Sequence, residues 1–541
     1  MRNALDPLRR LSLEVALLGV AAVVSVAFVA CLLLIPNNSF VHPDFYRYIL
    51  PETLRDGLPF QWRDLANSMQ LRSPGEFRAR FLAYLIQAFD QKIRLYLYDH
   101  VLVLPSFSPL SWVLELVVGP YYLFRAVENL TQDRRAAFAA TIVYTSTVGF
   151  LSGLTMILLQ GKNLSNVAVI LCIYLASKIA KEARDRPWLL VETPGPSKYL
   201  LLLFLFLGLF LDEMPIFSLA LIPVLFPRLF LPSPFESIDW RRLLQNVLFY
   251  AIPVFAFLLV VLVAAPPITE ALFGFRFDYL GNTLLIGPNT RGAKSLLEGP
   301  YARFSWHLIF ENAMTLFGFA AVPSELSPFI KSDYGDYPGT QLNNGIKWAV
   351  VGGTIAVSSF LALRGKAPAR YGLRAMPLSF FGLCLFLTLL LVRHIPVATG
   401  FYYGAIFAAL FALFVGLSYG AIEEHRAPFR IMAAMAVLGL AITGTLNFSK
   451  VNRGWIVTHN ETLTRTSFGS IVRLAEPREL QRRELLAIWR AWKNRALTAY
   501  LDETPISAGA VYLVAELQAL DRVRFGTRPP RHQLVTGTSG Y

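Results

Sequence analysis

Long apolar runs, each separated from the next by a polar or charged segment, dominate the pattern along the chain. The first run covers residues 13–35, which is enough to cross a membrane, since a spanning helix needs about 20 mostly apolar residues. Comparable runs recur near residues 101–124, 136–159, 164–180, 199–231, 243–265, 346–363, 375–392, 399–419 and 428–447. With the run 199–231 divided into two spans, the pattern predicts an all-α polytopic membrane protein of about eleven transmembrane helices.

The run 199–231 is divided because it contains the acidic pair Asp212 and Glu213. Each ionised side chain at the middle of a membrane costs about 2.5–3.5 kcal/mol on insertion scales. Pro215 follows the pair and also disfavours an uninterrupted helix. We therefore expect two short spans, with Asp212 and Glu213 in the extracytoplasmic turn between them. The pair is either a second catalytic or cation-binding site, or a solvated turn in which Asp212 caps the next helix.

Basic residues predict the orientation of the spans, because Lys and Arg collect in cytoplasmic loops. Arg9 and Arg10 precede the first span, so we expect a cytoplasmic N-terminus and an external segment at residues 36–99. The apolar piece 304–323 lies within a second large external loop, residues 266–343. A span there would place basic residues outside, so we expect an interfacial or re-entrant helix instead.

The chain therefore divides into a transmembrane domain, residues 1–447, and a small extracytoplasmic C-terminal region, residues 448–541. In that region, residues 478–500 have the pattern of an amphipathic basic helix. In the first external loop, residues 75–98 repeat aromatic and aliphatic positions at helical spacing between cationic ones. Helices of this kind lie in the membrane interface with cations facing lipid head groups; an ordinary surface cap is the alternative.

Composition agrees with this picture. The chain has 541 residues, of which 55% are hydrophobic and 16% charged, against about 25% charged in soluble domains. The formal net charge of +14 follows from basic cytoplasmic loops and does not predict nucleic-acid binding. The three cysteines, Cys31, Cys172 and Cys384, lie in apolar runs without metal-ligand spacing, so we expect neither disulfides nor a zinc site.

Few segments of such a chain are polar enough to hold a reactive site. The leading candidate is the segment His42-Pro43-Asp44, just after the first span. A carboxylate there could accept a proton from a substrate hydroxyl or amine as a general base. We therefore predict Asp44 as the catalytic base. His42 either tunes or shares that proton, or is a structural histidine.

Cationic and aromatic side chains expected at the same membrane face are candidates for binding a phosphorylated substrate. They are Arg78, Arg80, Lys92, Arg393 and His394 for the phosphate, and Tyr402 and Tyr403 for a sugar. Arg303 and His307 share one helical face with Glu311 and are further candidates. The alternative for all of them is anchoring, because Arg and Tyr collect at helix ends in the interface.

This layout resembles the GT-C glycosyltransferases, polytopic enzymes that use a lipid-linked sugar donor and include protein O-mannosyltransferases and aminoarabinose transferases. The resemblance lies in the arrangement: a first span, an external loop with an early acidic residue and interfacial helices, and an extracytoplasmic C-terminal region. It implies that Asp44, in the place of the family's acidic residue, belongs to the catalytic centre. The loop lacks an Asp-x-Asp pair and no acidic residue separates the third and fourth spans, so no metal site is assigned.

The resemblance thus implies transfer of a sugar from a polyprenyl-phosphate-type lipid donor to a glycan, lipid or protein acceptor, outside a bacterial-type inner membrane. No cofactor is assigned, and dependence on a divalent metal stays open. One alternative is a transporter or a lipid or glycan flippase, in which buried charge lines a pathway. Another is a lipid-linked glycan polymerase or ligase, for which Arg303, Arg393 and His394 would be the important residues.

Overall fold

All regular elements in the part of the chain that the structure describes are helices, which confirms the all-α expectation. The structure is a computed structural model. It describes residues 2–34, 50–65, 80–103, 107–155, 160–182, 190–212, 214–226, 229–230, 239–274, 404–422, 426–467, 482–507 and 510–525. The expected spans 346–363 and 375–392, and the expected interfacial helix 304–323, lie outside these residues.

Five helices in the described residues are long and apolar enough to cross a membrane, or six if a bent pair is one span. The five are Leu13–Leu34, Pro109–Thr131, Asn163–Glu182, Trp240–Phe273 and Ala427–Leu446. Each overlaps a run that the hydropathy pattern singles out. The chain is therefore built as expected for a membrane protein of the helical class.

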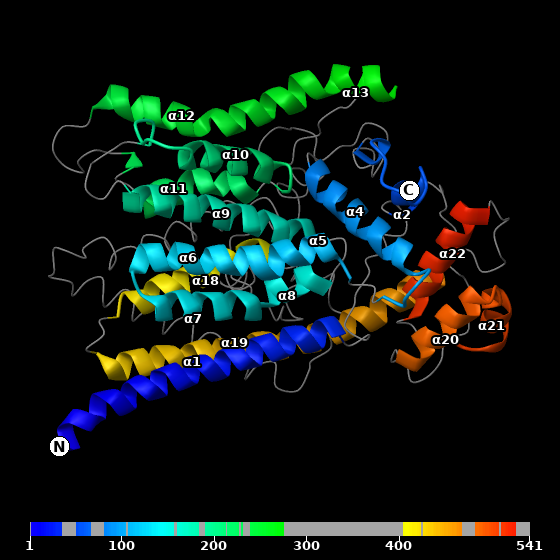
Figure 1. Cartoon of the computed structure of the whole chain (residues 1–541), viewed down its shortest axis with the longest axis horizontal. Helices are drawn as coiled ribbons and strands as arrows, with labels where there is room; N and C mark the ends of the chain where they lie inside the picture. Colours follow the sequence, from blue (N-terminus) through cyan, green and yellow to red (C-terminus); the bar gives the residue numbers. More distant parts are fainter. Residues whose placement is uncertain are drawn as a thin grey trace, which may run out of the picture.

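The centre of the bundle consists of helices that lie side by side with nearly parallel axes (Figure 1). They are α1 (Arg2–Leu34), α6 (Gly119–Thr131), α7 (Arg134–Ser146), α9 (Gln160–Glu182), α18 (Gly404–Gly420) and α19 (Ala427–Ser467). Small residues set their spacing: a Cβ at Gly416 of α18 would lie 2.8 Å from Ala140 Cβ of α7. One large apolar core joins these helices, and close packing of small residues is how membrane helices associate.

The expected span 136–159 is bent rather than straight. α7 ends at Ser146, α8 (Val148–Thr155) follows, and the two axes differ by 52°. Thr147 causes the break, because its backbone is extended and its Oγ1 accepts a hydrogen bond from Phe150 N at 3.2 Å. The side chain therefore caps α8 where α7 stops.

The predicted break in the run 199–231 is confirmed. α10 (Ser197–Leu209) ends before Asp212, and a short 3₁₀ helix η5 (Met214–Phe217) leads into α11 (Ser218–Leu225). A long outer helix follows, formed by α12 (Trp240–Leu259), the π-helical turn η7 (Val260–Ala264) and α13 (Ala265–Phe273). Figure 1 shows it along one side of the bundle, packed against α10.

A second, smaller core lies at one end of the bundle (Figure 1). We call it the small helical unit, and it comprises residues 50–65, 80–103, 482–507 and 510–525. Its helices are α2 (Leu50–Leu54), α4 (Phe81–Leu97), α20 (Arg482–Lys493), α21 (Leu497–Glu503) and α22 (Val511–Phe525). The first polar segment and the C-terminal region, which the sequence treats as separate, therefore share one core.

Within this unit, α20 has the amphipathic pattern that the sequence predicts. Leu485, Ile488 and Trp492 are buried, whereas Arg483 and Arg490 are exposed. α4 departs from its expectation, because its cationic residues Lys92 and Arg94 are 3% and 1% exposed. The prediction that these cations face lipid head groups is wrong, since α4 is covered by the bundle and by the C-terminal helices.

Candidate functional site

Two residues predicted for the active site from separate parts of the chain, Arg80 and Asp212, form an ion pair. Nη2 of Arg80 lies 3.3 Å from Oδ1 and 3.2 Å from Oδ2 of Asp212. The side chains are 16% and 5% exposed. Arg80 directly precedes α4, and Asp212 lies in the turn that follows α10. The pair therefore lies where the small helical unit meets the bundle.

Backbone and aromatic contacts hold the two segments in this position. Leu82 N donates to the carbonyl of Phe210 at 3.1 Å, and the rings of Phe81 and Phe210 have centroids 4.4 Å apart. α9 begins beside them: a Cβ at Gly161 would lie only 2.9 Å from Ala83 Cβ. Only glycine allows α4 to approach α9 so closely.

Lys92, the other described cation predicted to bind phosphate, has a partner elsewhere. Its Nζ lies 2.6 Å from Oδ1 of Asp64 and 3.1 Å from the carbonyl of Pro59. The Asp64 side chain is 1% exposed, so the pair is inside the small helical unit. The structure therefore does not bring Lys92 to Asp212, and its contact with substrate stays a prediction.

The remaining predicted site residues lie outside the described part of the chain. They are His42, Asp44, Arg78, Glu213, Arg303, His307, Arg393, His394, Tyr402 and Tyr403. Their grouping around a catalytic base therefore stays a prediction. No cluster of His, Cys, Asp and Glu suitable for a metal ion occurs among the described residues.

The arrangement of Arg80 and Asp212 has two chemical uses. A guanidinium can bind a phosphate through two hydrogen bonds, and it can release a carboxylate partner to do so. The same guanidinium holds the Asp212 carboxylate in a fixed position, from which the carboxylate could orient an acceptor hydroxyl. Asp212 is therefore held by a cation rather than by solvent, contrary to the alternative of a solvated turn.

Sequence reasoning missed Asp90, which positions the start of the second span. Its carboxylate accepts hydrogen bonds from Leu110 N at 2.7 Å, Ser111 N at 3.0 Å and Ser111 Oγ at 2.6 Å. α5 (Pro109–Trp112) begins at these donors. Burial raises the pKa of the Asp90 carboxyl, although the hydrogen bonds from Ser111 and Leu110 act in the opposite direction. In the sequence Asp90 lies opposite the apolar face of the helical pattern, so no local signal marked it as a buried residue.

Glu516, also missed, is the centre of the polar contacts inside the small helical unit. The Arg94 guanidinium pairs with its Oε1, Tyr98 Oη donates to its Oε2 at 2.8 Å, and Gln91 Nε2 donates to Oε1 at 3.2 Å. Burial and the nearby Glu516 carboxylate raise the pKa of Tyr98 well above its usual range. These contacts join α4 to α22 and fix the helix that carries Arg80 at its start.

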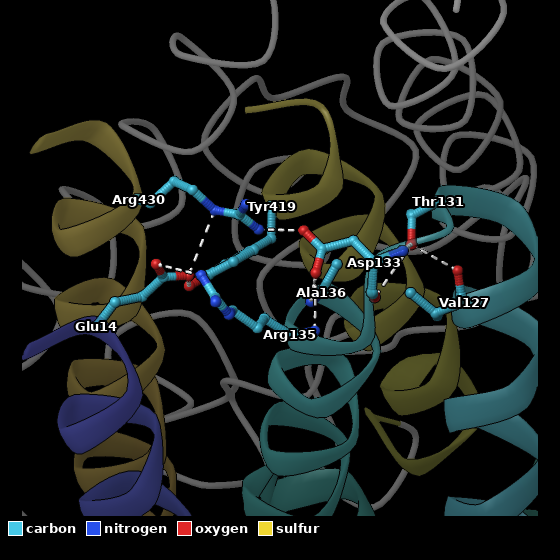
Figure 2. A network of polar contacts seen from close by, with 8 residues as sticks. All are labelled: Glu14, Val127, Thr131, Asp133, Arg135, Ala136, Tyr419 and Arg430. Atoms are coloured by element: carbon cyan, nitrogen blue, oxygen red, sulfur yellow. Dashed lines mark hydrogen bonds and ion pairs between the residues drawn. The ribbon is translucent and has the colours of Figure 1, made fainter. Parts of the chain in front are cut away.

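A third network lies at the opposite end of the bundle, where α1, α7, α18 and α19 approach one another (Figure 2). Glu14 accepts from Tyr419 Oη at 2.6 Å and pairs with Arg135 at 3.0 Å and Arg430 at 3.3 Å. Arg430 also pairs with Asp133, which caps α7. Two carboxylates balance two guanidinium groups, so the network fastens helix ends together without a buried net charge.

No protein-family model, curated protein or solved structure matches the chain significantly.

Proposed function

We propose that the protein is a membrane glycosyltransferase that moves a sugar from a polyprenyl-phosphate-type lipid to a glycan, lipid or protein acceptor. The Arg80–Asp212 pair is the observation that supports this most directly. A predicted phosphate-binding cation and a predicted acidic residue, 132 residues apart, meet beside the ends of membrane helices. The phosphate of a membrane lipid lies at the level of helix ends, where it would reach the side chains of Arg80 and Asp212.

In the proposed reaction, Asp44 removes the proton from the acceptor hydroxyl or amine. The acceptor atom then forms a bond to the anomeric carbon of the sugar while the bond from that carbon to the phosphate oxygen breaks. The lipid phosphate leaves with the bonding electron pair, and its growing negative charge needs a positive partner. Arg80 is the partner we assign, and Asp212 keeps the guanidinium in place until the phosphate arrives.

The proposal includes the finer description of the fold: about eleven spans in a GT-C-like arrangement. It places the protein in a bacterial-type inner membrane, with the N-terminus in the cytoplasm. The C-terminal region and the loops 36–99 and 266–343 would face the other side. Arg80 and Asp212 would then lie at the face where a lipid-linked donor presents its sugar.

A transporter or flippase is the competing function, and the broken segment around Asp212 favours it. Discontinuous helices near the membrane midplane often line a transport pathway. A lipid-linked glycan polymerase or ligase is the other alternative, because it shares the phosphate chemistry and would depend on Arg303, Arg393 and His394.

The deciding experiment supplies purified protein in nanodiscs with labelled polyprenyl-phosphate sugars and measures release of the lipid phosphate. We expect Asp44→Asn to lower the rate by about 10²–10⁴-fold, as for loss of a general base. Arg80→Gln should lower it by about 10²–10³-fold, as for loss of one group that stabilises developing charge. Asp99→Asn is the matched control, because it breaks a partly exposed ion pair with Arg524 in the same small helical unit.

The activities of wild type and the variants distinguish the candidate functions and the candidate residues. If wild type releases no lipid phosphate but moves labelled lipid across a vesicle membrane, the transferase proposal is wrong and the flippase is correct. If Asp44→Asn keeps activity while Asp212→Asn loses it, the reaction class is correct and the base is Asp212. If Arg80→Gln and Asp99→Asn behave alike, Arg80 has no part in binding the phosphate.

A further inference from the structure

A fully buried glutamate lies inside the bundle, within the candidate span Pro109–Thr131. Glu115 has 0% of its surface exposed, and it belongs to η3 (Val113–Val118), a stretch of π-helix between α5 and α6. π-Helical turns are rare and are frequently found at functional sites. Ionisable side chains within membrane spans are expensive to bury and commonly mark ion or substrate sites.

Two other helices bring polar side chains to Glu115. Gly119 lies one turn after it on the same helical face, and a Cβ there would lie 3.2 Å from Val167 Cγ2 and 3.7 Å from Tyr144 Cε1. Asn163 lies one turn before Val167 on α9, so it faces the turn that carries Glu115. Asn163 and Tyr144 are both close enough to interact with the Glu115 carboxyl.

The polar atoms of these three residues have few partners. Among the described residues, no hydrogen bond of normal geometry reaches Glu115 Oε1 or Oε2, Tyr144 Oη or Asn163 Oδ1. Asn163 Nδ2 is already used, because it donates to the carbonyl of Phe150 at 2.9 Å. Glu115, Tyr144 and Asn163 therefore bring several buried oxygen atoms together inside the bundle.

We propose that Glu115, Tyr144 and Asn163 form a binding site for a monovalent metal cation inside the bundle. Oxygen atoms from carboxylates, amides and hydroxyls are the ligands that hard cations prefer. The single carboxylate of Glu115 balances one positive charge, whereas a divalent ion would leave an uncompensated charge in an apolar interior. The cation would also join η3 to α7 and α9, next to the apolar contacts that connect Leu114 with Leu211 beside Asp212.

The test measures binding of ²²Na⁺ to the purified full-length protein, with K⁺ and Li⁺ as competitors. We expect one site per chain in wild type and at least about a 100-fold loss of affinity in Glu115→Gln, because the balancing charge is removed. Tyr144→Phe removes one oxygen and should weaken binding by about tenfold. Glu128→Gln is the matched control, since Glu128 lies in the same candidate span but pairs with Arg125 and Arg134; its affinity should equal that of wild type.

A second readout keeps the proposal testable if Glu115→Gln folds poorly. The melting temperature of wild type should rise in NaCl relative to N-methylglucamine chloride of equal ionic strength, and Tyr144→Phe should need more Na⁺ for the same rise. Absence of ²²Na⁺ binding by wild type would overturn the site, as would unchanged binding by Tyr144→Phe. A melting temperature that responds to pH but to no metal cation would identify a proton as the occupant. None of these results depends on whether the protein transfers sugars.

Discussion

At the scale of single residues, buried charge is tolerated where a second charge and several hydrogen bonds surround it. Arg94 and Glu516 have side chains 1% and 0% exposed, and each contacts further polar groups of the small helical unit. Removing one member of such a pair leaves the other charge buried and unpaired, which costs more than the pair itself contributes. The stability of the unit should therefore depend strongly on this contact.

We predict that Glu516→Gln destabilises the small helical unit by about 3–5 kcal/mol, because Arg94 then loses its counter-charge in the interior. Hydrogen exchange of α4 and α22 should be faster by about 10²–10⁴-fold. Asp99→Asn removes the carboxylate that pairs with Arg524, but these side chains are 34% and 20% exposed, so its effect should stay below about 1 kcal/mol. Equal exchange rates in the two variants would show that the buried pair contributes no more to stability than the partly exposed pair.

The partners of these residues were not predictable from the sequence, although the residues themselves were visible. The sequence predicts Arg80 as a phosphate-binding cation at the outer membrane face, and Asp212 as an acidic residue that is expensive next to lipid. Nothing in the local pattern indicated that they would pair with each other. Lys92 was read as a free cation because Asp64, 28 residues away, becomes its neighbour only when the loop folds. Residue type identifies a polar group that needs a partner, and tertiary structure decides which one it receives.

At the scale of helices, glycines mark the places where two axes come closest. A Cβ at Gly444 of α19 would lie 2.1 Å from the carbonyl oxygen of Ser146, at the end of α7 where the chain bends toward α8. Gly439, on the same helix, has no heavy atom within 4 Å of that position. The two glycines therefore make a matched pair that differs in packing alone.

We expect Gly444→Ala to destabilise the bundle by about 1–3 kcal/mol, because a backbone atom must move to admit the new methyl group. Gly439→Ala should change stability by less than about 1 kcal/mol and should favour the helix, since alanine loses less backbone entropy than glycine. Thermal unfolding followed by size-exclusion chromatography measures both. A melting temperature for Gly444→Ala equal to that of Gly439→Ala would contradict the close contact between α7 and α19.

Helix boundaries followed from the sequence wherever a local signal was strong. The acidic turn with Pro215 predicted the end of α10, and the amphipathic pattern of residues 478–500 predicted α20. The bend at Thr147 was missed, because a threonine in an apolar run has no sequence signature of a break. Burial of α4 was missed as well, since its pattern suits an interfacial helix until the C-terminal helices are known to cover it.

At the scale of the whole molecule, polar networks hold both ends of the apolar bundle. Glu14 and Arg430 join helices at one end, and the Arg80–Asp212 pair lies at the other, where the small helical unit packs. Figure 1 shows the long axes of α1, α6, α7 and α9 running between these ends. If these helices cross a membrane, the two ends lie on opposite sides of it, and the orientation predicted from the basic loops would put the Glu14 end in the cytoplasm.

Accessibility of single cysteines tests this arrangement in intact cells. Trp62 of the small helical unit is 85% exposed, and the Arg134 side chain at the opposite end is 84% exposed. In a background with Cys31 and Cys384 replaced by serine, a membrane-impermeant thiol reagent should label Trp62→Cys from outside. Arg134→Cys should react only after permeabilisation, because the membrane separates it from the reagent.

The same assay at Asp333→Cys decides how many spans the chain has. Labelling from outside is the expected result, because residues 304–323 are predicted to lie in the interface within the large external loop. Labelling that requires permeabilisation would make 304–323 a further span and would reverse the predicted orientation of every later segment. In that case the basic residues 364–374 would be external, against the usual distribution of Lys and Arg, while the C-terminal helices would still have to reach the small helical unit. A further span would also leave an odd number of spans between α4 and α20 and would therefore put these two helices on opposite sides of the membrane. Because α4 and α20 belong to one core, we expect external labelling at position 333.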